Sequence, residues 1–93
     1  MPTAGTDAVI ERKLTAGLSP LHLAVRDDSH LHAGHAGARG GGGHYSVVVV
    51  AAAFEGMGRL ERHRLVYSLL GNEMKSTIHA LALRTFTPDE WRG

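Results

Sequence analysis

The sequence predicts an α+β fold, in which helices cover one face of a three-stranded mixed sheet. Apolar residues recur at helical spacing in two segments, and three other segments have the alternating or continuous apolar pattern of strands. Along the chain the order is α-β-β-α-(α)-β. The 93 residues are enough for one core but not for two, so residues 1–93 are expected to form a single domain with a loose N-terminus at residues 1–5.

The first expected helix begins at Thr6 or Asp7, because either side chain can cap its first turn. Ile10 and Leu14 are one turn apart and form its apolar side. Gly17 is a residue type typical of helix ends, so we expect the helix to finish there.

A half-buried strand is expected next, at residues 21–26, because Leu21, Leu23 and Val25 alternate there with His22, Ala24 and Arg26 after Pro20. A His- and Gly-rich loop follows at residues 28–43. The segment 44–52 is rich in β-branched residues and is expected to be the central strand. We expect these first two strands to pair antiparallel despite the long loop.

A turn at residues 54–58 leads into the main helix, which is expected at residues 59–71. A short helical turn at 72–76 precedes the third strand at 78–86, and a terminal turn at 87–91 ends the pattern. Because the main helix carries the chain from the second strand to the third, these two strands are expected to be parallel, with a right-handed crossover.

The loop is the first candidate for a functional segment. It and the residue after it contain four of the seven histidines: His30, His32, His35 and His44. Structureless loops of this length usually carry function. Because the glycines at 40–43 lose much entropy when they become ordered, we expect the loop to be mobile without a partner. Two histidines three residues apart are a weak indication of metal binding, since a site usually needs three or four ligands. The alternative is a solvated loop whose histidines have no role.

Six motifs in the same order resemble the BolA family: "DDSHLHAGH", "GGGHY", "FEG", "RHRLVY", "IHALAL" and "TPDEW". The resemblance covers about residues 14–91. The doubled "HAGHAG" is most similar to plant-type and related bacterial members. The family resemblance implies an α-β-β-α-β fold similar to a type II KH domain, which agrees with the order expected from the residues.

Members of that family are similar in binding monothiol glutaredoxins, and such a pair can hold a [2Fe-2S] cluster between the two proteins, with glutathione on the partner side. The resemblance implies His79 as the fixed ligand and His32 as the mobile one, with His35 or His30 as a substitute. We therefore expect an adaptor in iron–sulfur trafficking or iron regulation. It would be a monomer alone and a heterodimer with its partner.

These histidines also have a plainer interpretation. His79 shares its parity with Leu81 and Leu83 in the expected third strand, and a histidine there is more often a partly buried, hydrogen-bonded side chain than a ligand. His22 and His44 are not expected to be ligands. A binding module without any metal is the corresponding third function.

The alternative function is a nucleic-acid-binding regulator that uses the main helix. The residues that would contact nucleic acid or a partner are His63, Arg64 and Lys75. A helical wheel puts Arg62 among the inward apolar residues and Arg64 on the opposite side, so these two arginines cannot form one basic patch. We expect Arg62 to pair with a carboxylate, for which Asp27 or Asp28 is the candidate, or to cap carbonyls near the helix start. The helix junction also lacks the GXXG loop of nucleic-acid-binding KH domains.

Composition argues against several other functions. A net charge of +1 with neutral histidines gives no strong attraction to nucleic acid or anionic lipid. The absence of cysteine excludes disulfides and any thiolate ligand from this chain. No nucleophile or phosphate-loop motif is present, so we do not expect an enzyme. We expect a cytoplasmic protein, with a plastid or mitochondrial location after removal of a transit peptide as the open alternative.

Overall fold

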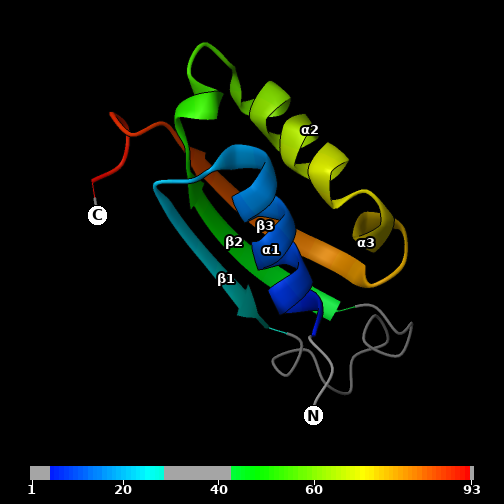
Figure 1. Cartoon of the computed structure of the whole chain (residues 1–93). Helices are drawn as coiled ribbons and strands as arrows, with labels where there is room; N and C mark the ends of the chain where they lie inside the picture. The colour runs from blue at the N-terminus through cyan, green and yellow to red at the C-terminus, as the bar shows by residue number, and fades with distance from the viewer. Residues whose placement is uncertain (1–4, 29–42, 93) are drawn as a thin grey trace.

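The computed structural model describes residues 5–28 and 43–92. The elements follow the predicted order (Figure 1). They are α1 (Thr6–Leu18), β1 (His22–Asp27), β2 (Gly43–Val50), the short 3-10 helix η3 (Ala52–Phe54), α2 (Arg59–Leu70), α3 (Asn72–Lys75) and β3 (Ile78–Phe86).

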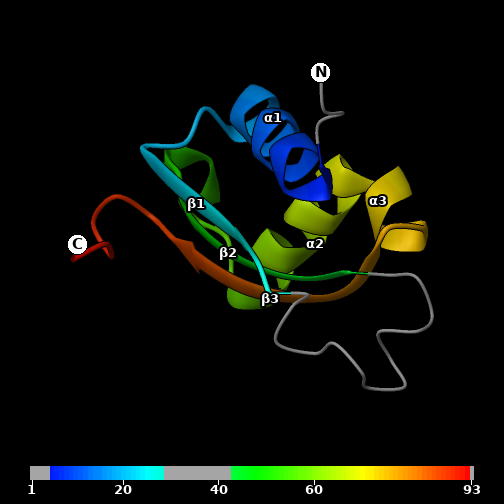
Figure 2. The same cartoon turned by 90° about the horizontal axis from the view of Figure 1, so that it is seen from below.

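The three strands form one mixed sheet in the order β1-β2-β3. β1 is antiparallel to β2, and β2 is parallel to β3, so both predicted pairings are confirmed. Figure 2 shows α1 and α2 on the same face of this sheet. The opposite face carries no helix in the part of the chain that the structure describes.

The core lies between the two long helices and the sheet. α1 contributes apolar side chains that are one helical turn apart, and β2 contributes every second side chain, as the periodicities of a helix and a strand require. The fully or almost fully buried side chains of this core cluster are Ile10, Leu14, Leu18, Tyr45, Val47, Val49, Ala51, Phe54, Val66, Leu70, Ile78 and Leu83. Because alternate residues of β2 enter this core, the residues between them point to the face without helices.

Both ends of α1 differ from the prediction. Gly5 precedes the first turn and no side chain caps it, so capping by Thr6 or Asp7 is wrong. Gly17 lies inside the helix, and Ser19 adopts the left-handed conformation at its end, with φ 46°. Gly17 has a packing role: a Cβ there would lie 2.7 Å from a methyl group of Leu69. The glycine therefore lets α1 approach α2 closely.

The strand bounds shift by one or two residues. The first strand was expected at 21–26 but is His22–Asp27, and Leu21, 69% exposed, precedes it. The central strand ends at Val50, where η3 begins shortly after, rather than at residue 52. The third strand has the predicted bounds, Ile78–Phe86. The hydrophobic pattern predicts which segments form strands, but not the residue at which each strand begins or ends.

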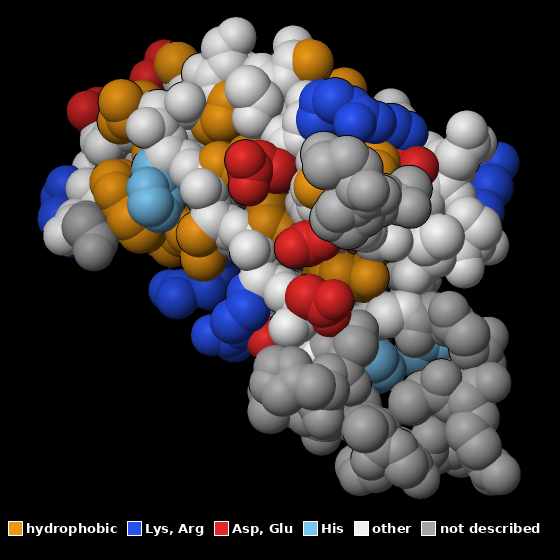
Figure 3. Space-filling model, turned by 60° about the horizontal axis from the view of Figure 1, so that its bottom comes forward, with side chains coloured by type: hydrophobic (Ala, Val, Ile, Leu, Met, Phe, Trp, Pro, Cys, Tyr) orange, Lys and Arg blue, Asp and Glu red, His pale blue; other side chains and the backbone are white. Residues whose placement is uncertain are grey.

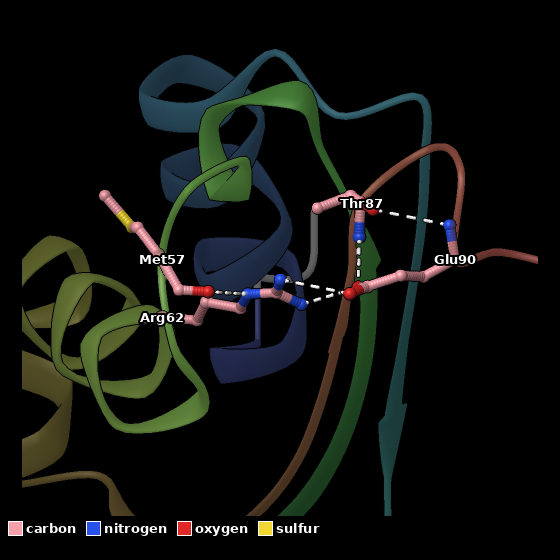
Figure 4. A network of polar contacts seen from close by, with 4 residues as sticks. All are labelled: Met57, Arg62, Thr87 and Glu90. Atoms are coloured by element: carbon pink, nitrogen blue, oxygen red, sulfur yellow. Dashed lines mark hydrogen bonds and ion pairs between the residues drawn. The ribbon is translucent and has the colours of Figure 1, made fainter.

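Arg62 joins α2 to the C-terminal turn (Figure 4). Its side chain is 12% exposed, so its predicted inward position is confirmed. It donates hydrogen bonds to the backbone carbonyl of Met57 at 2.9 Å and to both carboxylate oxygens of Glu90, at 2.6 and 3.2 Å. The carboxylate was predicted to be Asp27 or Asp28, and this is wrong.

The turn after β3 brings Glu90 to this position. Its carboxylate also accepts a hydrogen bond from the backbone N–H of Thr87 at 2.9 Å. These hydrogen bonds, that of Arg62 foremost, lower the pKa of Glu90 to about 2. Asp28 has different partners: it accepts from Arg26 at 2.6 Å and from the hydroxyl of Ser46.

Candidate histidine site at the end of the sheet

His79 lies at a β-bulge, which gives it an exposed side chain. Gly43 of β2 pairs with Ile78, and the next residue, His44, pairs with Ala80. His79 is therefore the extra residue, opposite no partner on β2. Bulges redirect side chains at sheet ends in this way and occur frequently next to functional sites.

The bulge corrects the prediction for His79. The sequence pattern placed it on the face of Leu81 and Leu83, with a partly buried side chain. Those two leucines do face the core, and so does Ile78, although it has the opposite parity. The extra residue at the bulge explains why Ile78 and the two leucines face the same side, because it shifts the alternation of side chains by one residue.

His44 lies next to His79. Their ring centroids are 5.1 Å apart, and the ring planes are tilted by 47°. His44 is followed by Tyr45, whose ring enters the core, so His44 points to the face without helices. Figure 3 shows histidine side chains at two separate places on this face of the molecule. Sequence reasoning missed this neighbour of His79, although the parallel pairing of the two expected strands brings their first residues together.

The backbone around Gly43 is closely packed. Its N–H donates to the carbonyl of Thr77 at 2.9 Å, just before β3 begins. A Cβ on Gly43 would lie 2.5 Å from the ring of Tyr45, which is buried. The last glycine of the "GGGG" run is thus required for space beside the two histidines.

The predicted mobile ligands adjoin this end of the sheet in sequence. Asp28 and His44, on either side of the long loop, are joined by a backbone hydrogen bond of 2.7 Å. His30, His32 and His35 lie outside the described residues. Within residues 5–28 and 43–92, no three His, Cys, Asp or Glu side chains form a group that could hold a metal ion. The pairing of His32 with His79 is therefore still a prediction.

The remaining described histidines lie elsewhere. His22 stacks on Trp91, with ring centroids 5.0 Å apart, and Trp91 also contacts Phe86 at the other end of β3. His63 contacts the edge of the Tyr67 ring on α2. Burial, followed by the charge of Arg59, lowers the pKa of His63.

The three residues predicted to contact nucleic acid do not all line one cleft. His63 lines a cleft between α2 and β3, and neither Arg64 nor Lys75 lines it. Arg64 is exposed on α2, as the helical wheel predicts. Lys75 is the last residue of α3, the short helix that follows α2.

Comparison with known proteins shows which family the chain is related to. The family model described as BolA-like protein matches residues 14–90. The chain belongs to the BolA-like family. The E. coli "DNA-binding transcriptional regulator BolA" is 45% identical over 84 residues, which are 90% of this chain and 77% of that protein. The structure of BolA1 from Arabidopsis thaliana superposes with a TM-score of 0.84 at 38% identity, covering 98% of this chain and all of the other.

A BolA domain also occurs within a longer protein. The Arabidopsis "SufE-like protein 1, chloroplastic/mitochondrial" is 44% identical over 86 residues, and the match covers 87% of this chain but 23% of that protein. The name of that relative assigns it to organelles. In the part of this BolA-like chain that the structure describes, no helix has the length and apolar character needed to cross a membrane.

Proposed function

We propose that this BolA-like chain is an adaptor that binds a monothiol glutaredoxin and helps to hold a [2Fe-2S] cluster shared with it. The observation that carries the proposal is the His44–His79 pair. Two imidazoles lie side by side at the start of β2 and the start of β3, where the histidine-rich loop joins the sheet.

The donor atoms present are compatible with such a cluster. Imidazole nitrogen is a suitable ligand for iron, and the chain has no cysteine that could compete. Two histidines would fill two of the ligand positions of the cluster, so the remaining positions require thiolates from the partner's cysteine and from glutathione. Bound in this way, the cluster would supply one-electron chemistry or a transferable iron–sulfur unit. Neutral imidazole in place of thiolate would raise its potential, as in Rieske centres.

The chain's own contribution is to position the ligands. The bulge turns His79 outward. The pairing of its neighbours Ile78 and Ala80 with β2, and the packing of Ile78, hold its backbone in place. We propose His79 as the fixed ligand. The second ligand is either His32 from the loop, with His35 or His30 as a substitute, or His44, which already lies beside His79.

Two variants separate these choices for the second ligand. The visible circular dichroism spectrum of the mixed complex is recorded with His44→Ala and with a triple His30/His32/His35→Ala variant. Loss of the spectrum in one variant alone assigns the second ligand to that segment. An unchanged spectrum in both would show that this chain supplies no second histidine.

Nucleic-acid binding is the second candidate, because the E. coli relative is named a DNA-binding transcriptional regulator. The arrangement of cations does not favour it. Arg62 is bonded to Glu90 within the fold, and Arg64 lies apart from the cleft that His63 lines. The adaptor role is therefore the one that the described residues support better.

A further inference from the structure

A cleft of about 530 Å³ lies between the first half of α2 and the second half of β3, far along the strand from His79. Met57, Arg59 and His63 line it on one side, and Leu83 to Phe86 line it on the other. Arg62 and Glu90, bonded to each other, also line it. Its size is in the usual range for ligand sites.

The cleft runs along the outer edge of β3. Successive side chains of a strand point to opposite faces, so four consecutive residues can line one cleft only where it follows the strand's edge. β3 is the last strand of the sheet order, and no described strand pairs with its outer side. An unpaired edge offers backbone N–H and C=O groups to an added strand.

The charges along this edge are positive and largely unpaired. The guanidinium of Arg62 is neutralised by Glu90. Arg59 and Arg84 are both exposed, and neither forms an ion pair with another described residue. Arg84 lies over the ring of Phe86, 5.4 Å from its centre, which fixes it at the rim. His63 adds no charge at neutral pH, because burial and the nearby Arg59 lower its pKa.

We propose that this edge binds an acidic, extended segment of a protein partner, which adds to β3 as a fourth strand and places carboxylates against Arg59 and Arg84. The free backbone edge suits a peptide, since a nucleic acid offers no matching backbone groups. The site is independent of His44, His79 and the proposed cluster.

The test uses the full chain and a labelled peptide of alternating Glu and Val, acetylated and amidated, nine residues long. Fluorescence anisotropy at low salt measures its affinity beside two matched peptides, with Gln or Lys in place of Glu. We expect the Glu peptide to bind at least about tenfold more tightly than either. Backbone amide signals of residues 83–86 should shift on binding, whereas those of β1, the other sheet edge, should not.

Arg59→Glu and Arg84→Glu should each weaken binding of the Glu peptide at least about tenfold, and Arg64→Glu, with the same charge change outside the cleft, by less than about twofold. Far-ultraviolet circular dichroism checks that each variant is folded. Three results would overturn the proposal: equal affinity for the three peptides, equal effects of the three variants, or tighter binding of a duplex DNA than of the Glu peptide at physiological salt.

Discussion

A single guanidinium, that of Arg62, connects three parts of the fold. It bonds to the carbonyl of Met57 before α2 and to Glu90 after β3, and its carbon lies 5.9 Å from the centre of the buried Phe54 ring. An isolated surface ion pair contributes little to stability. Arg62 differs because its side chain is mostly buried, so its removal would leave the partly buried carbonyl of Met57 without this donor.

Arg62→Ala should therefore destabilise the protein more than Arg64→Ala. We expect the free energy of unfolding to fall by about 1.5–3 kcal/mol for Arg62→Ala. For Arg64→Ala, at an exposed position, we expect a fall of roughly a few tenths of a kcal/mol. Urea denaturation of both variants measures this. Equal midpoints would show that the contacts of Arg62 contribute nothing beyond those of a surface arginine.

The Glu90 carboxylate should make stability depend on acid. Its pKa falls from 4.5 to about 2 on folding, so its ionised form contributes stability above pH 4.5, and this contribution is lost as the pH falls toward 2. Glu90→Gln should be less stable than wild type at neutral pH, and its stability should fall less steeply across this window. Thermal melts at several pH values measure the slope. Glu55→Gln, at an exposed carboxylate without a described ion pair, is the control and should keep the wild-type slope.

At the scale of elements, the start of β2 and the start of β3 together form the candidate site. Gly43, His44 and His79 take their positions from one bulge and from the ring of Tyr45. The strands themselves were predictable, since β-branched runs and a crossover helix dictate a parallel pair. The bulge was not, because two strands can pair with or without an extra residue and only packing of Ile78 and Leu81 decides it.

Gly43→Ala should destabilise the sheet at this point. The added methyl group would lie 2.5 Å from the buried, rigid ring of Tyr45, and overpacking of this kind costs about 1–3 kcal/mol. Differential scanning calorimetry should give a larger drop in melting temperature than for Gly58→Ala, where the nearest atom is 3.7 Å from the new Cβ. A drop no larger than that of Gly58→Ala would mean that the ring moves away without cost.

At the scale of the whole molecule, the described residues leave one sheet face without helices and the outer edge of β3 without a pairing strand, and function is proposed for both. Element order, strand pairing and the inward position of Arg62 followed from periodicity. The partner of Arg62 and the neighbour of His79 did not, because each joins residues far apart in sequence through a turn or a register. The histidines at 30, 32 and 35 lie outside the described residues, so their role is still inferred from resemblance.

Duplex DNA should bind weakly to the whole chain. With a net charge of +1 and its arginines separated, we expect dissociation constants in the nonspecific range, about 10⁻⁴ to 10⁻⁶ M at physiological salt. A titration by fluorescence anisotropy measures them. Submicromolar binding that depends on DNA sequence would favour the regulator instead of the adaptor.

The most direct measurement of the central claim is the visible spectrum of the reconstituted complex. The chain is mixed with a monothiol glutaredoxin, iron, sulfide and glutathione, and compared with the glutaredoxin alone. We predict a spectrum distinct from that of the glutaredoxin homodimer, lost in His79→Ala, retained in the distant His22→Ala, and weakened in mild acid because a protonated imidazole cannot bind iron. A spectrum and lifetime unchanged by His79→Ala would contradict the account, since His79 would then hold no part of the cluster.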